Sequence, residues 1–231
     1  GHLPKDSTLA LTGLGLTFPI LMLVTAFTNL FGMGGAPLFS IARGKQDNKR
    51  AARIMGTTFT MLFLSGILLT ILGLLFKKPL LYLFGASDST FPFADTYLSL
   101  YLLGNVFVMF SLGMNNFINA QGFAKKGMLT VLIGAVLNII LDPVFIFILD
   151  MGVAGAALAT ILSQMISALW VLRFLTGKET LIRLTRDNLH IHLPLLGEII
   201  SLGTSGFIMS FTNSAVQIVC NASLQNFGGD I

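Results

Sequence analysis

Long runs of apolar residues alternate with short polar connections along the whole chain. Six of these runs are long enough to cross a bilayer as helices, for which about 20 residues are needed at a rise of 1.5 Å per residue. We place them at about residues 9–31, 54–76, 97–118, 128–149, 151–172 and 195–224. Because the connections are short, successive helices should cross in opposite directions. The pattern predicts an all-α integral membrane protein.

One span holds an acidic residue well inside its apolar run. Asp142 stands in LTVLIGAVLNIILDPVFIFIL, residues 129–149, where a carboxylate costs about 2.5–3.5 kcal/mol on insertion scales. Asn138 precedes it by four residues, so both side chains project from one helical face. Pro143 follows, and because it has no N–H it leaves the carbonyl of Ile139 without its helical partner.

These oxygen atoms allow two interpretations of the span. Carboxylate, amide and freed carbonyl oxygens are groups that bind protons and hard cations, and an intramembrane acid is by default a functional residue. This favours a coupling or substrate site at Asp142. The alternative is a polar contact between packed helices, with the proline only bending its helix.

Composition excludes several classes of protein. Of the 231 residues, 54% are hydrophobic and 10% are charged, whereas about 25% are charged in soluble domains. The net charge of +4 does not indicate nucleic-acid binding, because the basic residues lie in the connections. A single cysteine, Cys220, leaves no intrachain disulfide and no cysteine metal site. We also find no Ser-His-Asp set and no phosphate-binding loop.

Lysine and arginine are distributed unequally between alternate connections. Eleven of the 14 lie in one set, which should face the cytoplasm under the positive-inside rule. They are Arg43, Lys45, Lys49, Arg50, Arg53, Lys125, Lys126, Arg173, Lys178, Arg183 and Arg186. In this orientation Asp142 lies about seven residues, roughly 10 Å, from the outer end of its helix.

Several other features of the chain are polar or rich in small residues. Asparagine and tyrosine recur in the third span, where interhelical hydrogen bonding and a role in a site are both open. In the fifth span Gly155, Ala159 and Ser163 recur every four residues, which predicts a close-packed face. We expect the glycines of GMGGAP, residues 32–37, to loosen or kink the first span. Residues 178–193 should form either an amphipathic surface helix or a solvated linker.

Four blocks of sequence resemble the multidrug and toxic compound extrusion (MATE) family, most closely its bacterial multidrug-efflux branch. They are TNLFGMGGAPLFSIARGKQDNKRAARIMGTTFT, LGMNNFINAQGFAKKGM, LIGAVLNIILDPVFIF and GVAGAALATILSQ. Family members have twelve helices in two lobes of six around a central cavity. The resemblance covers essentially the whole chain and implies a fragment spanning helices two to seven. Residues 1–177 would then be the N-terminal lobe without its first helix, 178–193 a cytoplasmic linker between lobes, and 194–231 the first helix of the C-terminal lobe.

The resemblance also implies a set of cation-binding residues in the N-terminal lobe. Asn138 and Asp142 match the family's pair on helix 5, Thr160 its threonine on helix 6, and Asn115 and Tyr97 its asparagine and tyrosine on helix 4. The family's acid on helix 1 has no counterpart in this sequence. We expect no cofactor, and no metal beyond possible Na⁺ at Asp142.

The function that follows is a secondary antiporter in the bacterial inner (plasma) membrane. It would export cationic amphiphilic drugs in exchange for H⁺ or Na⁺, as a monomer embedded in the lipid bilayer, and would not be an enzyme. Two alternatives stay open. One is a flippase for lipid-linked oligosaccharides of the same superfamily, which should need a basic cavity that these spans lack. The other is a membrane scaffold or enzyme subunit.

Overall fold

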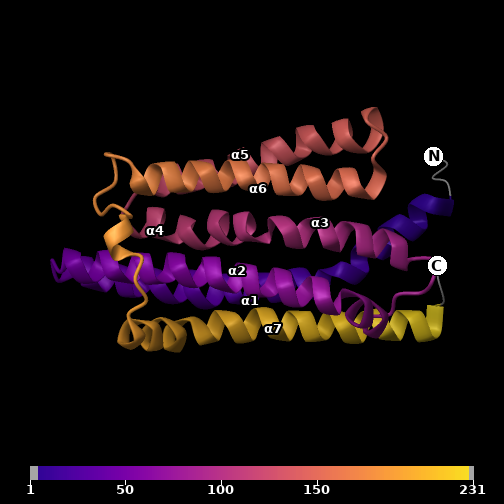
Figure 1. Cartoon of the computed structure of the whole chain (residues 1–231), viewed down its shortest axis with the longest axis horizontal. Coiled ribbons are helices and arrows are strands. Elements are labelled where there is room, and N and C mark those ends of the chain that lie inside the picture. The colour runs from indigo at the N-terminus through magenta and orange to yellow at the C-terminus, as the bar shows by residue number, and fades with distance from the viewer. Residues whose placement is uncertain (1–4, 229–231) are drawn as a thin grey trace.

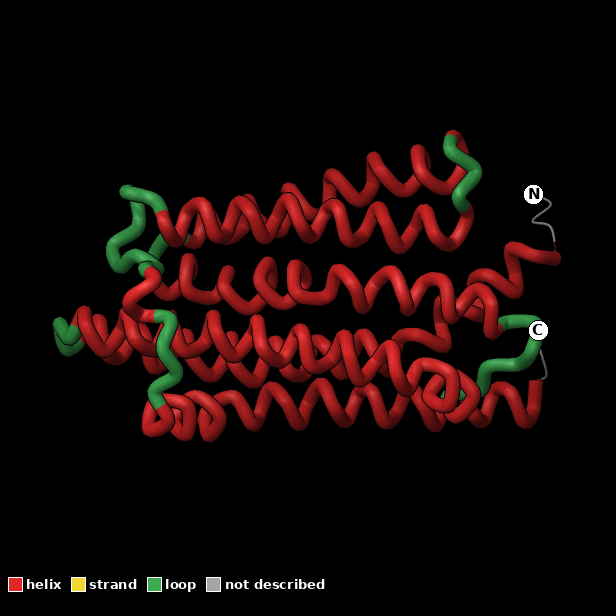
Figure 2. The backbone as a smooth tube through the Cα atoms, in the orientation of Figure 1, coloured by secondary structure: helices red, strands yellow, loops and turns green. Residues whose placement is uncertain are grey.

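Six long helices run back and forth along one direction and place their connections at two ends (Figures 1 and 2). The structure is a computed structural model, which describes residues 5–228. The helical elements are α1 (Lys5–Gly44), α2 (Asn48–Leu83), α3 (Phe91–Met109), the π-helix η1 (Phe110–Met114), α4 (Asn115–Ala120), α5 (Ala124–Pro143), the π-helix η2 (Val144–Ile148), α6 (Gly152–Thr176), the 3₁₀-helix η3 (Arg186–Asn188) and α7 (Leu193–Gly228).

The predicted number of spans is confirmed. Within the described residues, six helices are long and apolar enough to cross a membrane; α3, η1 and α4 together make one of them, as do α5 and η2. Several spans extend further than their apolar runs suggested. The first helix continues to Gly44 and the second to Leu83, because polar residues at a helix end can reach water beyond the hydrocarbon.

The helices form a layered bundle in which α5 and α6 lie at one edge and α7 at the other (Figure 1). α6 packs on both α5 and α3, while α1 packs on α2, α3 and α7. Most of the third span is buried, whereas α5 exposes most of its apolar surface. α5 with η2 therefore has the smallest buried share of the six spans.

The glycines of residues 32–37 do not loosen the first span as we expected. α1 is an unbroken helix through this stretch, and its glycines allow neighbouring helices to approach. A Cβ on Gly34 would lie 2.1 Å from the carbonyl oxygen of Ile199 in α7, and one on Gly203 would lie 1.8 Å from that of Leu30. α1 and α7 therefore touch backbone to backbone. Close to this crossing, Asn29 donates a hydrogen bond to Ser210 at 3.0 Å.

The segment between α6 and α7 is not an amphipathic helix, and although most of its residues are exposed, part of it is packed against the bundle. Apart from η3 it is irregular, and Ile182 and Leu184 are buried. The side-chain oxygen of Gln121 accepts hydrogen bonds from the Thr180 hydroxyl (2.7 Å) and from the backbone N–H groups of Leu181 (2.9 Å) and Ile182 (3.0 Å). Gln121 thus fixes the segment to the end of α4.

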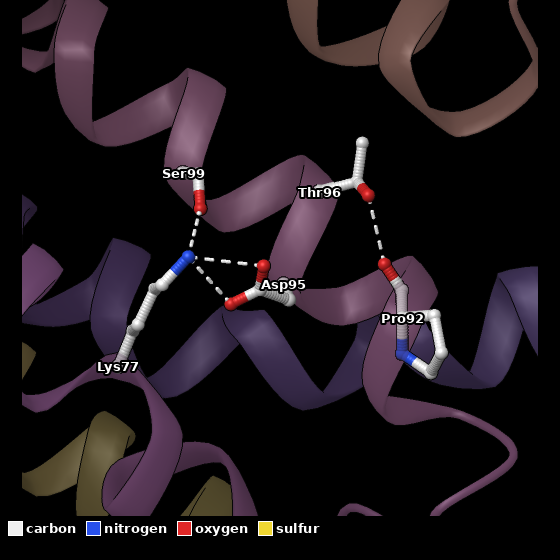
Figure 3. A network of polar contacts seen from close by, with 5 residues as sticks. All are labelled: Lys77, Pro92, Asp95, Thr96 and Ser99. Atoms are coloured by element: carbon white, nitrogen blue, oxygen red, sulfur yellow. Dashed lines mark hydrogen bonds and ion pairs between the residues drawn. The ribbon is translucent and has the colours of Figure 1, made fainter.

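An ion pair lies at the opposite end of the bundle, between α2 and α3 (Figure 3). The Lys77 ammonium is 2.8 Å from one carboxylate oxygen of Asp95 and 3.0 Å from the other, and it donates to the Ser99 hydroxyl at 2.9 Å. Both charged side chains are less than a third exposed. Lys77 therefore lies within α2 and has a charged partner on α3.

Candidate functional site

The predicted pair on α5 shares one face of the helix, as the four-residue spacing indicated. The Asn138 amide donates a hydrogen bond to the Asp142 carboxylate at 3.2 Å. Both side chains are half-buried. Among the described residues, Asn138 is the only one that forms a hydrogen bond with this carboxylate. Asp142 therefore keeps acceptor positions for a proton, a cation or water.

Helix geometry changes immediately after Asp142. The π-helix η2 begins at Val144, directly after Pro143, and the N–H of Leu149 bonds the carbonyl of Val144, five residues earlier, at 2.9 Å. α6 approaches closely here, since a Cβ on Gly155 would lie 2.8 Å from the Phe145 carbonyl carbon. Wide turns of this kind are frequent at functional sites, and this one fixes the helix beside the carboxylate.

α6 and α3 bring two further predicted residues to the same place. The Thr160 hydroxyl donates to the carbonyl of Ala156 at 3.0 Å, which leaves its lone pairs available. Tyr97 lies within electrostatic reach of both Thr160 and Asp142. Tyr97 is buried and stacks on Tyr101, with ring centroids 6.2 Å apart. Three helices thus bring together four of the five predicted residues.

Asn115 lies apart from this group. Its amide donates to the carbonyl of Gly127 at 3.2 Å, and Gly127 precedes Asn138 by eleven residues on α5, or about 16 Å along the helix. The Asn115 side-chain oxygen is buried and has no partner among the described residues. The structure therefore places Asn115 nearer the end of the bundle where α5 begins.

A cavity of about 210 Å³ opens beside Asn138 and Thr160, between α5, α6 and the η1 end of the third span. The other polar side chains in its wall are Ser111, Thr130, Ser163, Gln164 and Ser167. Ser111 bonds Gln164 across the helices, and the fully buried Ser163 hydroxyl has no partner. The volume is enough for several water molecules at about 30 Å³ each.

Sequence reasoning found only part of this cavity. Ser163 was assigned to the small face of α6, which is confirmed because Gly155, Ala159 and Ser163 are all buried. The polar stripe of Thr160, Ser163, Gln164 and Ser167 on one helix was the available signal, because a three- or four-residue spacing puts these side chains along one face. No sequence pattern predicts the π-helix η1, which brings Ser111 to the cavity.

The arrangement suits the binding of a small cation or a proton. A carboxylate, an amide and hydroxyl groups offer hard oxygen ligands, and the walls of the cavity contain no lysine or arginine. Within the described residues, no three His, Cys, Asp or Glu side chains gather as a transition-metal site would require. The chemistry available is therefore reversible occupation of one carboxylate.

Two curated relatives carry the same name. The multidrug export protein MepA of Staphylococcus saprophyticus is 27% identical over 218 residues, which are 94% of this chain and 48% of the relative. MepA of Staphylococcus aureus strain MRSA252 is 28% identical over 222 residues, again 94% of this chain and 48% of the relative. The chain spans about half the length of the curated relatives it matches.

Solved structures give the same match in three dimensions. One, described as the inward-facing conformation of a multidrug resistance MATE family transporter of the MOP superfamily, aligns with a TM-score of 0.92 at 26% identity over 96% of this chain and 51% of that one. A structure described as the outward-facing conformation of such a transporter aligns at 0.86 with 27% identity, over 99% and 50%. The six spans therefore correspond to about half of a twelve-helix transporter.

A family model agrees with these likenesses. The MatE model matches residues 1–144, which is more than half of the chain and includes α1 to α4, Asn138 and Asp142. This multi-pass protein of the bacterial plasma membrane belongs to the MATE family of transporters.

Proposed function

We propose that this chain is part of a secondary antiporter that exports cationic, amphiphilic compounds in exchange for H⁺ or Na⁺, acting as a monomer. The observation that carries the proposal is the position of Asp142. It is a half-buried carboxylate inside an apolar span, hydrogen-bonded by Asn138 and close to Thr160 and Tyr97. A charge in such a place is costly, and proteins retain one where it serves a pathway.

Each residue around the carboxylate has a distinct role in this proposal. Asp142 binds the proton or Na⁺, while Asn138 orients the carboxylate and can supply an amide oxygen. Thr160 and Tyr97 add hydroxyl groups from two other helices. Occupation of Asp142 therefore changes the interactions among α5, α6 and α3. The adjoining cavity, lined by uncharged polar groups, admits water to the site.

Coupling follows from the free energy of the charge. Neutralising Asp142 removes a cost of about 2.5–3.5 kcal/mol. If two conformations of the bundle differ in how far they expose the carboxylate, this free energy changes the ratio of their populations on the order of 100-fold. Linkage then requires that the cation and the exported compound alter each other's affinity by the same factor.

The test is dye efflux from drug-sensitive cells that express the full-length protein. Wild type, Asp142→Asn and a matched control, Asp150→Asn, are compared under an imposed proton gradient or an imposed sodium gradient. Asp150 is an exposed acid just beyond the outer end of the same helix, and its positive φ of 52° is readily adopted by asparagine. The control removes the same charge outside the site.

The expected result is gradient-driven efflux in wild type and Asp150→Asn, with loss of at least tenfold in Asp142→Asn. The gradient that supports efflux identifies the coupling ion. Unchanged efflux in Asp142→Asn would leave the carboxylate as a packing residue and refute its coupling role. Absence of efflux from wild type under both gradients would refute the antiporter and favour a lipid-linked oligosaccharide flippase.

A further inference from the structure

A second cavity lies at the cytoplasmic ends of α5 and α6, far along the bundle from Asp142. Its volume is about 480 Å³, and its wall combines residues from the first turn of α5, the last turns of α6 and the segment that follows. These residues are Lys126, Trp170, Arg173, Phe174, Gly177, Lys178 and Glu179. Neither the apolar spans nor the proposed antiport site requires a cavity here.

The cavity has an excess of positive charge. Lys126, Arg173 and Lys178 face one carboxylate, that of Glu179. Glu179 is 3.5 Å from the Lys126 ammonium, but the lysine side chain is 42% exposed and the glutamate side chain 72% exposed, so the pair is weak. Within residues 5–228, the side chains of Arg173 and Lys178 form no ion pair or hydrogen bond. At least two cations are therefore free to bind an anion.

Trp170, the chain's only tryptophan, lines the same cavity. Its indole N–H is shielded from solvent and has no acceptor among the described residues. Tryptophan at this depth is typical of the membrane interface. The Lys126 ammonium lies 5.8 Å from the centroid of its ring. The ring of Trp170 and the Lys126 ammonium therefore form one side of the cavity.

Apolar side chains continue from the cavity along the surface of the bundle. Met128, Val131 and Leu132 on α5 and Leu169 on α6 are all more than half exposed, and they begin within one turn of Lys126 and Trp170. A ligand with a phosphate at one end and acyl chains at the other would match both surfaces at once. A free inorganic anion would contact only the basic cavity.

We propose that this cavity binds the phosphate headgroup of an anionic phospholipid from the cytoplasmic leaflet, with the acyl chains lying along α5 and α6. Arg173 and Lys178 supply the charge, Arg173 can hold two phosphate oxygens at once, and Trp170 and Lys126 border the headgroup. Basic pockets between helices on the cytoplasmic side are suited to such lipids. The proposal is independent of antiport.

The test measures lipid binding to the full-length protein by native mass spectrometry in a mild detergent. Dioleoyl-phosphatidylglycerol is titrated against dioleoyl-phosphatidylcholine, which has the same chains and no net charge, and inorganic phosphate serves as the soluble anion. The variant Arg173→Gln/Lys178→Gln removes two lining cations. The control Arg183→Gln/Arg186→Gln removes two exposed cations of the same connection that do not line the cavity.

We expect wild type and the control to bind phosphatidylglycerol at least tenfold more tightly than phosphatidylcholine, and the cavity variant to lose most of this preference. All four substituted side chains are exposed, so the variants should fold, which an unchanged size-exclusion profile would verify. Equal loss in both double variants would overturn the proposal in favour of diffuse attraction by the basic end. Displacement of the lipid by millimolar phosphate would overturn it in favour of a soluble-anion site.

Discussion

Replacing Gly203 by alanine should separate α1 from α7. The added Cβ would lie 1.8 Å from the Leu30 carbonyl oxygen, whereas ordinary contacts begin at 3.4 Å, so the backbones must move apart by about 1.6 Å. Both groups belong to helix backbones, and therefore no flexible side chain can yield in their place. The strain falls on the whole interface between the two helices.

The expected loss can be estimated from what this separation breaks. The Asn29–Ser210 hydrogen bond of 3.0 Å and the bond of 2.9 Å from Ser214 to the Pro19 carbonyl would exceed bonding distance, at about 0.6 kcal/mol each within a membrane. Overpacking adds about 1–3 kcal/mol, and the better helix propensity of alanine returns up to about 1 kcal/mol. The net destabilisation should be about 1–3 kcal/mol.

Thermal unfolding of purified full-length protein, followed by fluorescence-detected size-exclusion chromatography, measures this effect. Gly197→Ala is the matched control, because it lies on the same helix and its Cβ would meet nothing within 4 Å. Gly203→Ala should lower the midpoint by several degrees, whereas Gly197→Ala should leave it unchanged or raise it. If both variants melt alike, the close crossing of α1 and α7 is refuted.

Substitutions at three other places test separate parts of the bundle, the first two by thermal unfolding and the third by limited proteolysis. Lys77→Met and Asp95→Asn should each destabilise the protein by about 1–2 kcal/mol, because each single change leaves a partly buried partner unpaired. The double variant should lose less stability than the sum of the two single variants. Simple additivity would contradict the ion pair. Asn105→Leu should raise the midpoint, since both amide atoms of this fully buried side chain lack partners and each costs about 1–3 kcal/mol; a lower midpoint would reveal a bound water or ion. Gln121→Leu should leave two backbone N–H groups unpaired and speed limited tryptic cleavage at exposed Arg183 by tenfold or more; an unchanged rate would show that Gln121 does not hold the segment.

Periodicity predicted most of the fold and half of the site. The apolar runs gave six spans, and a four-residue spacing was enough to place Asn138 beside Asp142. The meeting of Tyr97, Thr160 and Asp142 depends on how α3, α5 and α6 are packed, and residue spacing within one helix contains no information about depth relative to another. These residues came from the family resemblance, which equally grouped Asn115 with them.

The features that sequence reasoning missed are those where local pattern and tertiary contact disagree. Ile182 and Leu184 alternate with basic residues, which suggested a surface segment, but both are buried. Gln121 donates to the carbonyl of Ile182, and the N–H of Leu184 bonds the carbonyl of Leu175 on α6. Gln121 itself stands beside Gly122 in a connection, where a polar residue is ordinarily solvated. The π-helix η1 contains no proline, and a wide turn without one leaves no mark on hydrophobic periodicity.

The segment between α6 and α7 is held at both of its ends by the lobe it leaves. Besides the hydrogen bonds to Gln121, the hydroxyls of Thr57 and Thr60 on α2 donate to the carbonyls of His190 (3.3 Å) and Leu189 (2.7 Å). A segment that is hydrogen-bonded near both ends is a rigid connection and not a flexible linker. The start of α7 at Leu193 is therefore held beside α2, and the rest of that helix packs on α1.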